Sequence, residues 1–231
     1  MDKLINSALK SFRSLAAPGM TGIIIKSIII TIIFLSLLVG GLIYASAVAA
    51  DHWSYWRYAG YISWVASFGA IILAWFLFPG IMPLIVSFFD ESIIRNIENH
   101  EYPPASPPIE TSIWREFPHD LKFALKALLL NIILLPFYLI PVVNFFIFLA
   151  LNGHLLGSEF YLTVARRHLP YKEAVAARKA NSSLVFLGGI LLVFLATIPI
   201  INLIAPFWGI AMMTHLYHLN NSPLSRSETK L

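Results

Sequence analysis

The chain has 231 residues, of which 58% are hydrophobic and only 12% are charged. A soluble domain carries about 25% charged residues. This deficit, together with apolar runs longer than about 18 residues, predicts an integral membrane protein. The absence of cysteine excludes disulfides and cysteine-based metal sites. The excess of basic residues is expected in the loops of a membrane protein, so we expect no nucleic-acid partner.

Residues 1–22 are predicted to form an amphipathic helix. Apolar side chains recur there at helical spacing, while lysine and arginine stand between them: the apolar set is Leu4, Ile5, Ala8, Leu9, Phe12 and Leu15, and the basic set is Lys3, Lys10 and Arg13. Such a helix lies in the plane of the membrane interface with its apolar face toward the lipid.

Residues 23–89 contain two apolar segments, at about 23–50 and 61–89, separated by the aromatic sequence DHWSYWRYAGY. A helix of about 28 residues is about 42 Å long, which exceeds the membrane core of about 30 Å. Tryptophan and tyrosine are typical anchors at the membrane interface. We therefore expect two spanning helices, the second kinked by Pro79 and Pro83.

Residues 90–120 are polar by comparison. They open with DESIIRNIENH, which continues the helical pattern, and go on to YPPASPPIE, which has four prolines in nine residues. A segment so rich in proline forms a stiff extended connector. We expect a cytoplasmic extension rather than a separate domain.

The sequences IPVVN (140–144) and IPIIN (198–202) each interrupt a long apolar run. The pieces on either side hold about 15 residues, or about 22 Å of helix, which is too short for an upright crossing. We therefore expect two hemi-penetrating helical hairpins, at 121–157 and 184–216. The alternative is two pairs of short, complete transmembrane helices. Asn144 and Asn202 would lie near the hairpin tips, where their amides could satisfy free backbone groups.

The distribution of lysine and arginine predicts that both termini lie in the cytoplasm. The segments expected on one side are the N-terminal helix, the 90–126 region, the 158–181 loop and the tail at 217–231. They hold all of the 16 lysines and arginines except Lys26 and Arg57. Positive residues collect on the cytoplasmic side of a membrane.

The order of these segments resembles the CysZ family of bacterial sulfate transporters. The resemblance rests on APGMTGIIIKS, the proline-rich connector, the two interrupted runs and RRHLPYKEAVAARKANSS. It implies sulfate uptake across the inner membrane for cysteine biosynthesis, with sulfite or related oxyanions as further ligands. It also implies a fold of two long transmembrane helices plus two hemi-penetrating hairpins, assembled as homo-oligomers among membrane lipids.

The sequence PGMTG at the start of the first span is a candidate oxyanion site, because a helix N-terminus offers backbone N–H donors to an anion. The resemblance implies arginines just after this Pro-Gly pair, and this chain has none there; Lys26 is the nearest cation. The candidate sulfate-binding residues are therefore Gly19, Met20, Thr21, Gly22 and Lys26. The alternatives are an ordinary helix start and a lysine that extends to the lipid headgroups.

Other polar residues at membrane depth favour structural roles. Asn144 and Asn202 are candidates for hairpin support or for a pore lining. His215 and His218 are three residues apart, but with no third ligand nearby we reject a metal site. Glu159 is expected to pair with Arg166 or Arg178.

No nucleotide motif and no cluster of acid, base and nucleophile is present, so we expect no cofactor and no enzyme. The alternative to a transporter is a membrane scaffold that transports nothing.

Overall fold

The computed structural model describes residues 1–52, 59–102 and 113–221, which form helices and no strand. The predicted all-α class is therefore confirmed. The chain divides into two compact units, Thr21–Phe89 and the combination of Met1–Met20 with Asp90–Leu231. The elements are α1 (Asp2–Leu15), α2 (Met20–His52), α3 (Ala59–Ser87), α4 (Asp90–Glu101), α5 (Ile113–Leu134), η1 (Leu135–Leu139), α6 (Pro141–His168), α7 (Tyr171–Ala180), α8 (Ser182–Ala196), α9 (Pro199–Asn202) and α10 (Ala205–Asn221).

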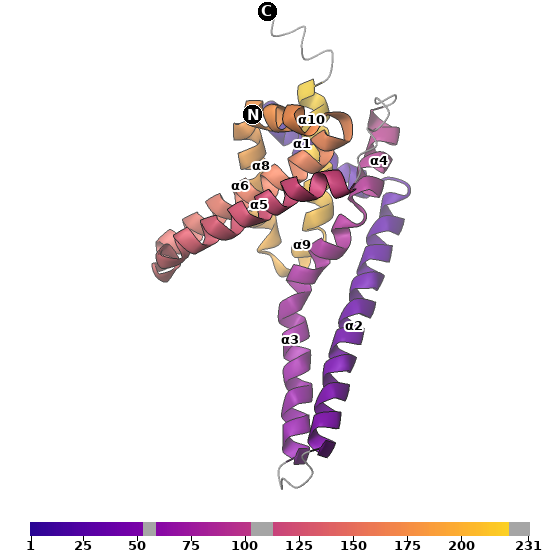
Figure 1. The fold of residues 1–231 in the computed structure, drawn as a ribbon. Helices are drawn as coiled ribbons and strands as arrows, with labels where there is room; N and C mark the ends of the chain where they lie inside the picture. The colour runs from indigo at the N-terminus through magenta and orange to yellow at the C-terminus, as the bar shows by residue number, and fades with distance from the viewer. Residues whose placement is uncertain (53–58, 103–112, 222–231) are drawn as a thin grey trace, which may run out of the picture. The chain divides into compact units, whose positions relative to one another are not determined.

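The unit Thr21–Phe89 consists of α2 and α3, which run antiparallel to each other (Figure 1). Their bounds agree with the two predicted spans to within a few residues. Thr31 is buried, and its Oγ1 lies 3.4 Å from Sδ of Met82. Ile25 and Ile33 are about half exposed, as expected of side chains that face lipid. The turn at 53–58 lies outside the described residues, and α3 stays helical through Pro79 and Pro83.

The second unit is built around α10, whose residues 205–217 are all buried. Helices α1, α4, α6 and α8 pack on it (Figure 1). Trp208 and Phe207 are among the largest fully buried side chains. The Trp208 indole donates to the carbonyl oxygen of Ala8 at 3.3 Å, which joins α10 to α1. An apolar helix enclosed in this way forms the core of the unit.

Helix α1 packs through a face that its apolar pattern did not indicate. Its buried residues are Leu4, Ser7, Ser11 and Ser14. The hydroxyls of Ser7 and Ser11 donate to the carbonyls four residues earlier, and the Ser14 hydroxyl lies 3.1 Å from the Lys10 carbonyl oxygen. The small side chains allow α10 to approach closely. The apolar stripe is more than half exposed, at Ile5, Leu9 and Phe12. A helix forms at the N-terminus as expected, but it ends at Leu15, and residues 20–22 belong to α2. Its place at a membrane interface remains a prediction.

The first interrupted run breaks where predicted, but its second arm is longer than expected. Helix α6 has 28 residues and does not end near Gly157; that length gives about 42 Å. The segments with the length and apolar character of membrane spans, among the described residues, are Met20–Val48 and Val142–His168. The premise that this arm is too short to cross is therefore wrong, and α6 fits the alternative of a complete crossing.

Two further segments, the proline-rich connector and the expected 158–181 loop, are more helical than predicted. Helix α5 begins at Ile113, so part of the expected connector is helical, while residues 103–112 lie outside the described residues. The expected 158–181 loop is mostly helical as well, formed by the end of α6 and by α7, which meets α8 at a bend of 83°.

The second interrupted run divides as predicted. Helices α8 and α10 have 15 and 17 residues, and the short α9 stands between them. Helix α8 is shorter than the roughly 17 residues that a crossing of the membrane core requires, and α10 is at that limit. The tail at 222–231 lies outside the described residues. Whether α8 to α10 enter the membrane from one side only remains a prediction.

Candidate functional site

The predicted oxyanion site begins at a tight turn before α2. Gly19 has a φ of +85°, which L side chains rarely adopt. A Cβ at this position would lie 2.7 Å from Asn96 Nδ2, and the same amide donates to the Pro18 carbonyl at 3.0 Å. The α1–α2 turn is therefore held by α4. Glycine is required here by conformation and by the closeness of Asn96.

The remaining candidates occupy the first turns of α2. Met20 is fully buried and its backbone N–H donates to Ala17 at 3.2 Å. Thr21, Gly22 and Lys26 are exposed, and no acidic residue stands in this first turn. The start of α2 is thus open to a ligand at Thr21 and Gly22, with Lys26 one turn beyond Gly22.

Asn144 and Asn202 lie at the two breaks, as the repeated sequence predicted. Asn144 is in the first turn of α6, and Asn202 is the last residue of α9. Both are partly exposed. Their side-chain amides hydrogen bond no other described residue, whereas their backbone N–H groups bond Ile140 and Ile198. The expected repair of the break by the amides is therefore absent from the described part of the chain.

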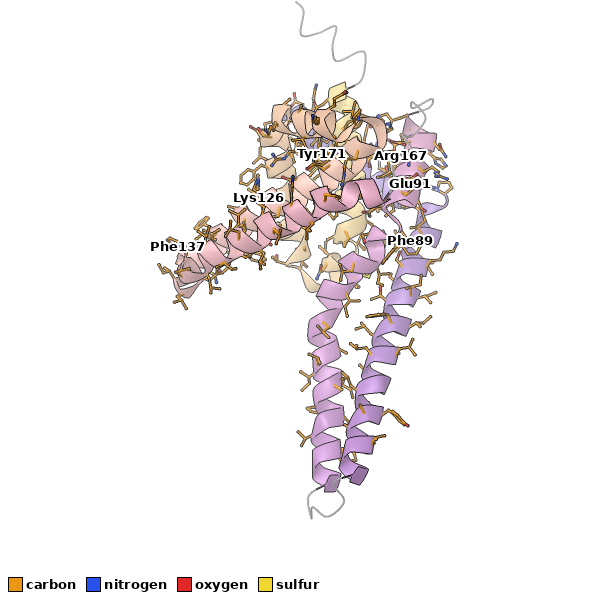
Figure 2. All side chains as sticks on the ribbon, viewed as in Figure 1. Phe89, Glu91, Lys126, Phe137, Arg167 and Tyr171 are labelled. Carbon is orange, nitrogen blue, oxygen red and sulfur yellow. The ribbon has the colours of Figure 1, made fainter. Side chains whose placement is uncertain are left out.

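A buried carboxylate, which the sequence did not single out, joins three helices. Glu98 on α4 is 4% exposed. Its Oε1 accepts from His168 Nε2 at 2.6 Å and from His218 Nε2 at 3.0 Å, and its Oε2 accepts from Arg167 Nε at 3.0 Å. Arg167 also pairs with Glu91 (Figure 2). Burial would raise the pKa of Glu98, but the bonds from the two histidines and the nearby charges outweigh it and lower the pKa to about 2.

A second polar cluster lies one turn away on α10. His215 is fully buried. Its Nε2 lies 2.9 Å from Ser14 Oγ, and its Nδ1 lies 2.8 Å from Tyr102 Oη. The Ser14 hydroxyl donates to Glu101 at 2.6 Å, so it accepts from the histidine Nε2–H. Tyr102 also stacks on His218 at 4.3 Å, which links the two clusters.

The fold separates the two histidines whose spacing suggested a shared ligand. His215 faces Ser14 and Tyr102, whereas His218 joins Glu98 and His168. The ligand atoms of Glu98, His168 and His218 lie within 4.8 Å of one another, a donor set that suits zinc. Both histidines already donate to one carboxylate oxygen and Arg167 neutralises the other, so the set is satisfied as an ion-pair cluster.

Comparison with known proteins identifies the family. No curated protein sequence matches the chain. The family described as sulfate transporter CysZ/etoposide-induced protein 2.4 matches residues 7–206. This match spans α1 to the start of α10 and confirms the resemblance that the sequence motifs indicated. The chain therefore belongs to the sulfate transporter CysZ/etoposide-induced protein 2.4 family.

Proposed function

We propose that this protein carries sulfate, or a related oxyanion such as sulfite, across a membrane. The observation that carries the proposal is the family match over residues 7–206. The two helices with the length and apolar character of spans support it. A scaffold that transports nothing is the alternative, because family membership alone does not demonstrate flux.

We further propose the bacterial inner membrane as its location and the supply of sulfate for cysteine biosynthesis as its role. Both termini lie in the cytoplasm, and several copies assemble among the lipids. The distribution of lysine and arginine supports this orientation. The hairpin proposed for α8 to α10 would enter from the cytoplasmic side.

Substrate is proposed to bind at the start of α2, at Gly19, Met20, Thr21, Gly22 and Lys26. Asn144 and Asn202 at the two breaks remain candidates for structural support or for a pore lining. Gly19 permits the tight turn, and the exposed first turn directs backbone N–H groups toward an anion. Lys26 supplies a cation one turn along the helix. Losing one hydrogen bond to a charged ligand costs about 1.5–3 kcal/mol.

Uptake of radiolabelled sulfate into liposomes that contain only this purified protein tests the function. Saturable uptake above empty liposomes is expected. The variants Thr21→Val and Lys26→Gln should each raise the half-saturating sulfate concentration about tenfold, whereas Lys3→Gln, which removes an exposed lysine from α1, should leave it unchanged.

Two outcomes of this experiment count against different parts of the proposal. No uptake by a folded preparation would favour the scaffold. Normal uptake by both α2 variants would remove the assigned site while leaving the transport function in place.

The orientation is tested with single cysteines, because the chain has none of its own. In intact cells, Arg57→Cys should react with a membrane-impermeant maleimide and Lys3→Cys should not. Both should react after the membrane is permeabilised. Labelling of Lys3→Cys alone in intact cells would reverse the proposed topology.

A further inference from the structure

A cavity of about 320 Å³ lies among α6, α7 and α8. Its polar lining consists of His154, Ser158, Arg178, Ser182 and Ser183. This volume is about ten times the space of one water molecule, which is about 30 Å³. It therefore accommodates a small polyatomic ion together with bound water.

Arg178 on α7 carries the positive charge of this cavity. Its Nε and Nη2 both donate to the Ser158 hydroxyl, at 3.1 and 2.7 Å, and Nη2 lies 3.4 Å from His154 Nε2. A guanidinium fork matches the two oxygens of a carboxylate, phosphate or similar oxyanion. Here the fork is directed at a single neutral oxygen.

No carboxylate within the described ranges lies within 4.0 Å of Arg178, so Arg178, one of the two partners expected for Glu159, does not pair with it. Arg167 differs, because Glu98 and Glu91 both neutralise it. A partly buried cation without a counter-ion is costly. An anion in the cavity would supply the missing charge.

The surroundings of the cavity add to its positive potential. Ser182 and Ser183 form the first turn of α8, which has no acidic residue. The side chain of Asn181, the N-cap residue, makes no capping hydrogen bond to this helix; its amide nitrogen donates to Tyr161 at 3.1 Å and to the Ala177 carbonyl at 2.9 Å. The N-terminal N–H groups and the helix dipole therefore favour negative charge.

Lys126 on α5, labelled in Figure 2, is close enough to His154 for its charge to act on that ring. The lining itself combines one guanidinium, three hydroxyls and a helix N-terminus. Carboxylates are absent from the lining.

We propose that this cavity binds one tetrahedral oxyanion, held by Arg178, by the hydroxyls of Ser182 and Ser183 and by the N-terminus of α8. The ligand is a free sulfate or phosphate ion, or the phosphate of an anionic lipid headgroup. This site uses residues other than those proposed at the start of α2. It does not depend on transport and would exist in a scaffold as well.

Equilibrium binding of radiolabelled sulfate to the full-length protein in a neutral detergent is the first test. Arg178→Gln should raise the dissociation constant of this site at least about tenfold. The matched control is Lys179→Gln, which removes the same charge from an exposed neighbour on α7. It should change the dissociation constant by less than about twofold. Arg178→Gln also removes the hydrogen bonds to Ser158, so its unfolding temperature without sulfate is measured as well, and sulfate binding is compared only in folded protein.

The double change Ser182→Ala with Ser183→Ala provides a second variant, since both side chains are exposed and carry little of the core. It should weaken sulfate binding about threefold or more. This variant keeps the test decisive if Arg178→Gln does not fold.

A second measurement distinguishes a lipid ligand from a free ion. The unfolding temperature of wild type and of the variants is compared in nanodiscs of phosphatidylglycerol and in nanodiscs of phosphatidylcholine. Stabilisation by phosphatidylglycerol but not by phosphatidylcholine that requires Arg178, without sulfate binding, would identify the phosphate of an anionic lipid headgroup as the ligand. If the cavity variants bind sulfate as tightly as Lys179→Gln does, and are stabilised by phosphatidylglycerol to the same extent, the proposed site is wrong. Binding at this site without sulfate flux would overturn the transport proposal alone.

Discussion

Replacing Gly189 with alanine is expected to lower the free energy of unfolding by about 3 kcal/mol or more. A Cβ on Gly189 would overlap the carbonyl oxygen of Gly153 and lie 3.0 Å from the Gly157 Cα. These obstructing atoms belong to the backbone of α6, so they cannot move aside as a flexible side chain can. Overpacking of a core costs about 1–3 kcal/mol and occasionally more.

The reason for this large effect is the closeness of α6 and α8. Gly153 and Gly157 are four residues apart on α6, and both lie against Gly189 on α8, whereas Gly188 faces Met212 and Met213 of α10. Small residues at this spacing let two helices approach to backbone contact. Separation of α6 from α8 would also move Ser158, which follows Gly157 directly, away from the cavity beside α8.

Thermal or SDS-induced unfolding of the purified protein measures the effect. Gly40→Ala is the control, because no atom lies within 4 Å of an added Cβ there. In the middle of α2 alanine is the better helix former, by up to about 1 kcal/mol. Unfolding of Gly189→Ala at the wild-type midpoint would show that α6 and α8 do not pack as closely as described.

The long apolar helices were predictable because composition and length determine them. Helices α2 and α3 agree with their predicted spans, since runs of isoleucine and leucine leave few alternatives in a membrane. The breaks at 136–141 and 199–206 were equally clear, because proline cannot donate to the preceding turn. These features are local, and a single sequence contains them in full.

The length of α6 and the packing face of α1 were not predictable in the same way. The sequence after Gly157 turns polar, which suggested an end to the buried arm. The structure keeps the helix because Ser158 bonds Arg178 and because Arg167 and His168 reach Glu98. Polar residues of a helix that find protein partners do not mark its end.

The candidate sites also divide into those that adjacent residues determine and those that depend on contacts between distant residues. The open start of α2 follows from the adjacent sequence PGMTG. The Glu98 cluster instead joins residues that are 69, 70 and 120 positions apart. Such pairs become visible only when α4, α6 and α10 are placed against one another. The cavity at Arg178 likewise depends on the 83° bend between α7 and α8.

The second large effect is expected at Glu98, where the variant Glu98→Gln should lose about 3 kcal/mol of stability at pH 7. Removal of one partner of a buried ion pair leaves the other charge uncompensated, which costs about 3–5 kcal/mol. Glu91 still pairs with Arg167 in this variant and neutralises part of its charge. We therefore expect the lower end of this range, about 3 kcal/mol. The exposed Glu173→Gln on α7 removes the same charge and should change stability by less than about 0.5 kcal/mol.

Acid unfolding distinguishes this explanation from a simple loss of packing. The pKa of Glu98 is lowered from 4.5 to about 2 in the folded protein, so the unfolded chain binds the proton more readily. The ionised carboxylate therefore stabilises the fold fully above about pH 4.5, and this stabilisation is lost as the pH falls toward 2. The difference in unfolding free energy between wild type and Glu98→Gln should shrink over that interval, whereas a difference that stays constant from pH 7 to pH 2 would assign the loss to packing and not to the ion pairs.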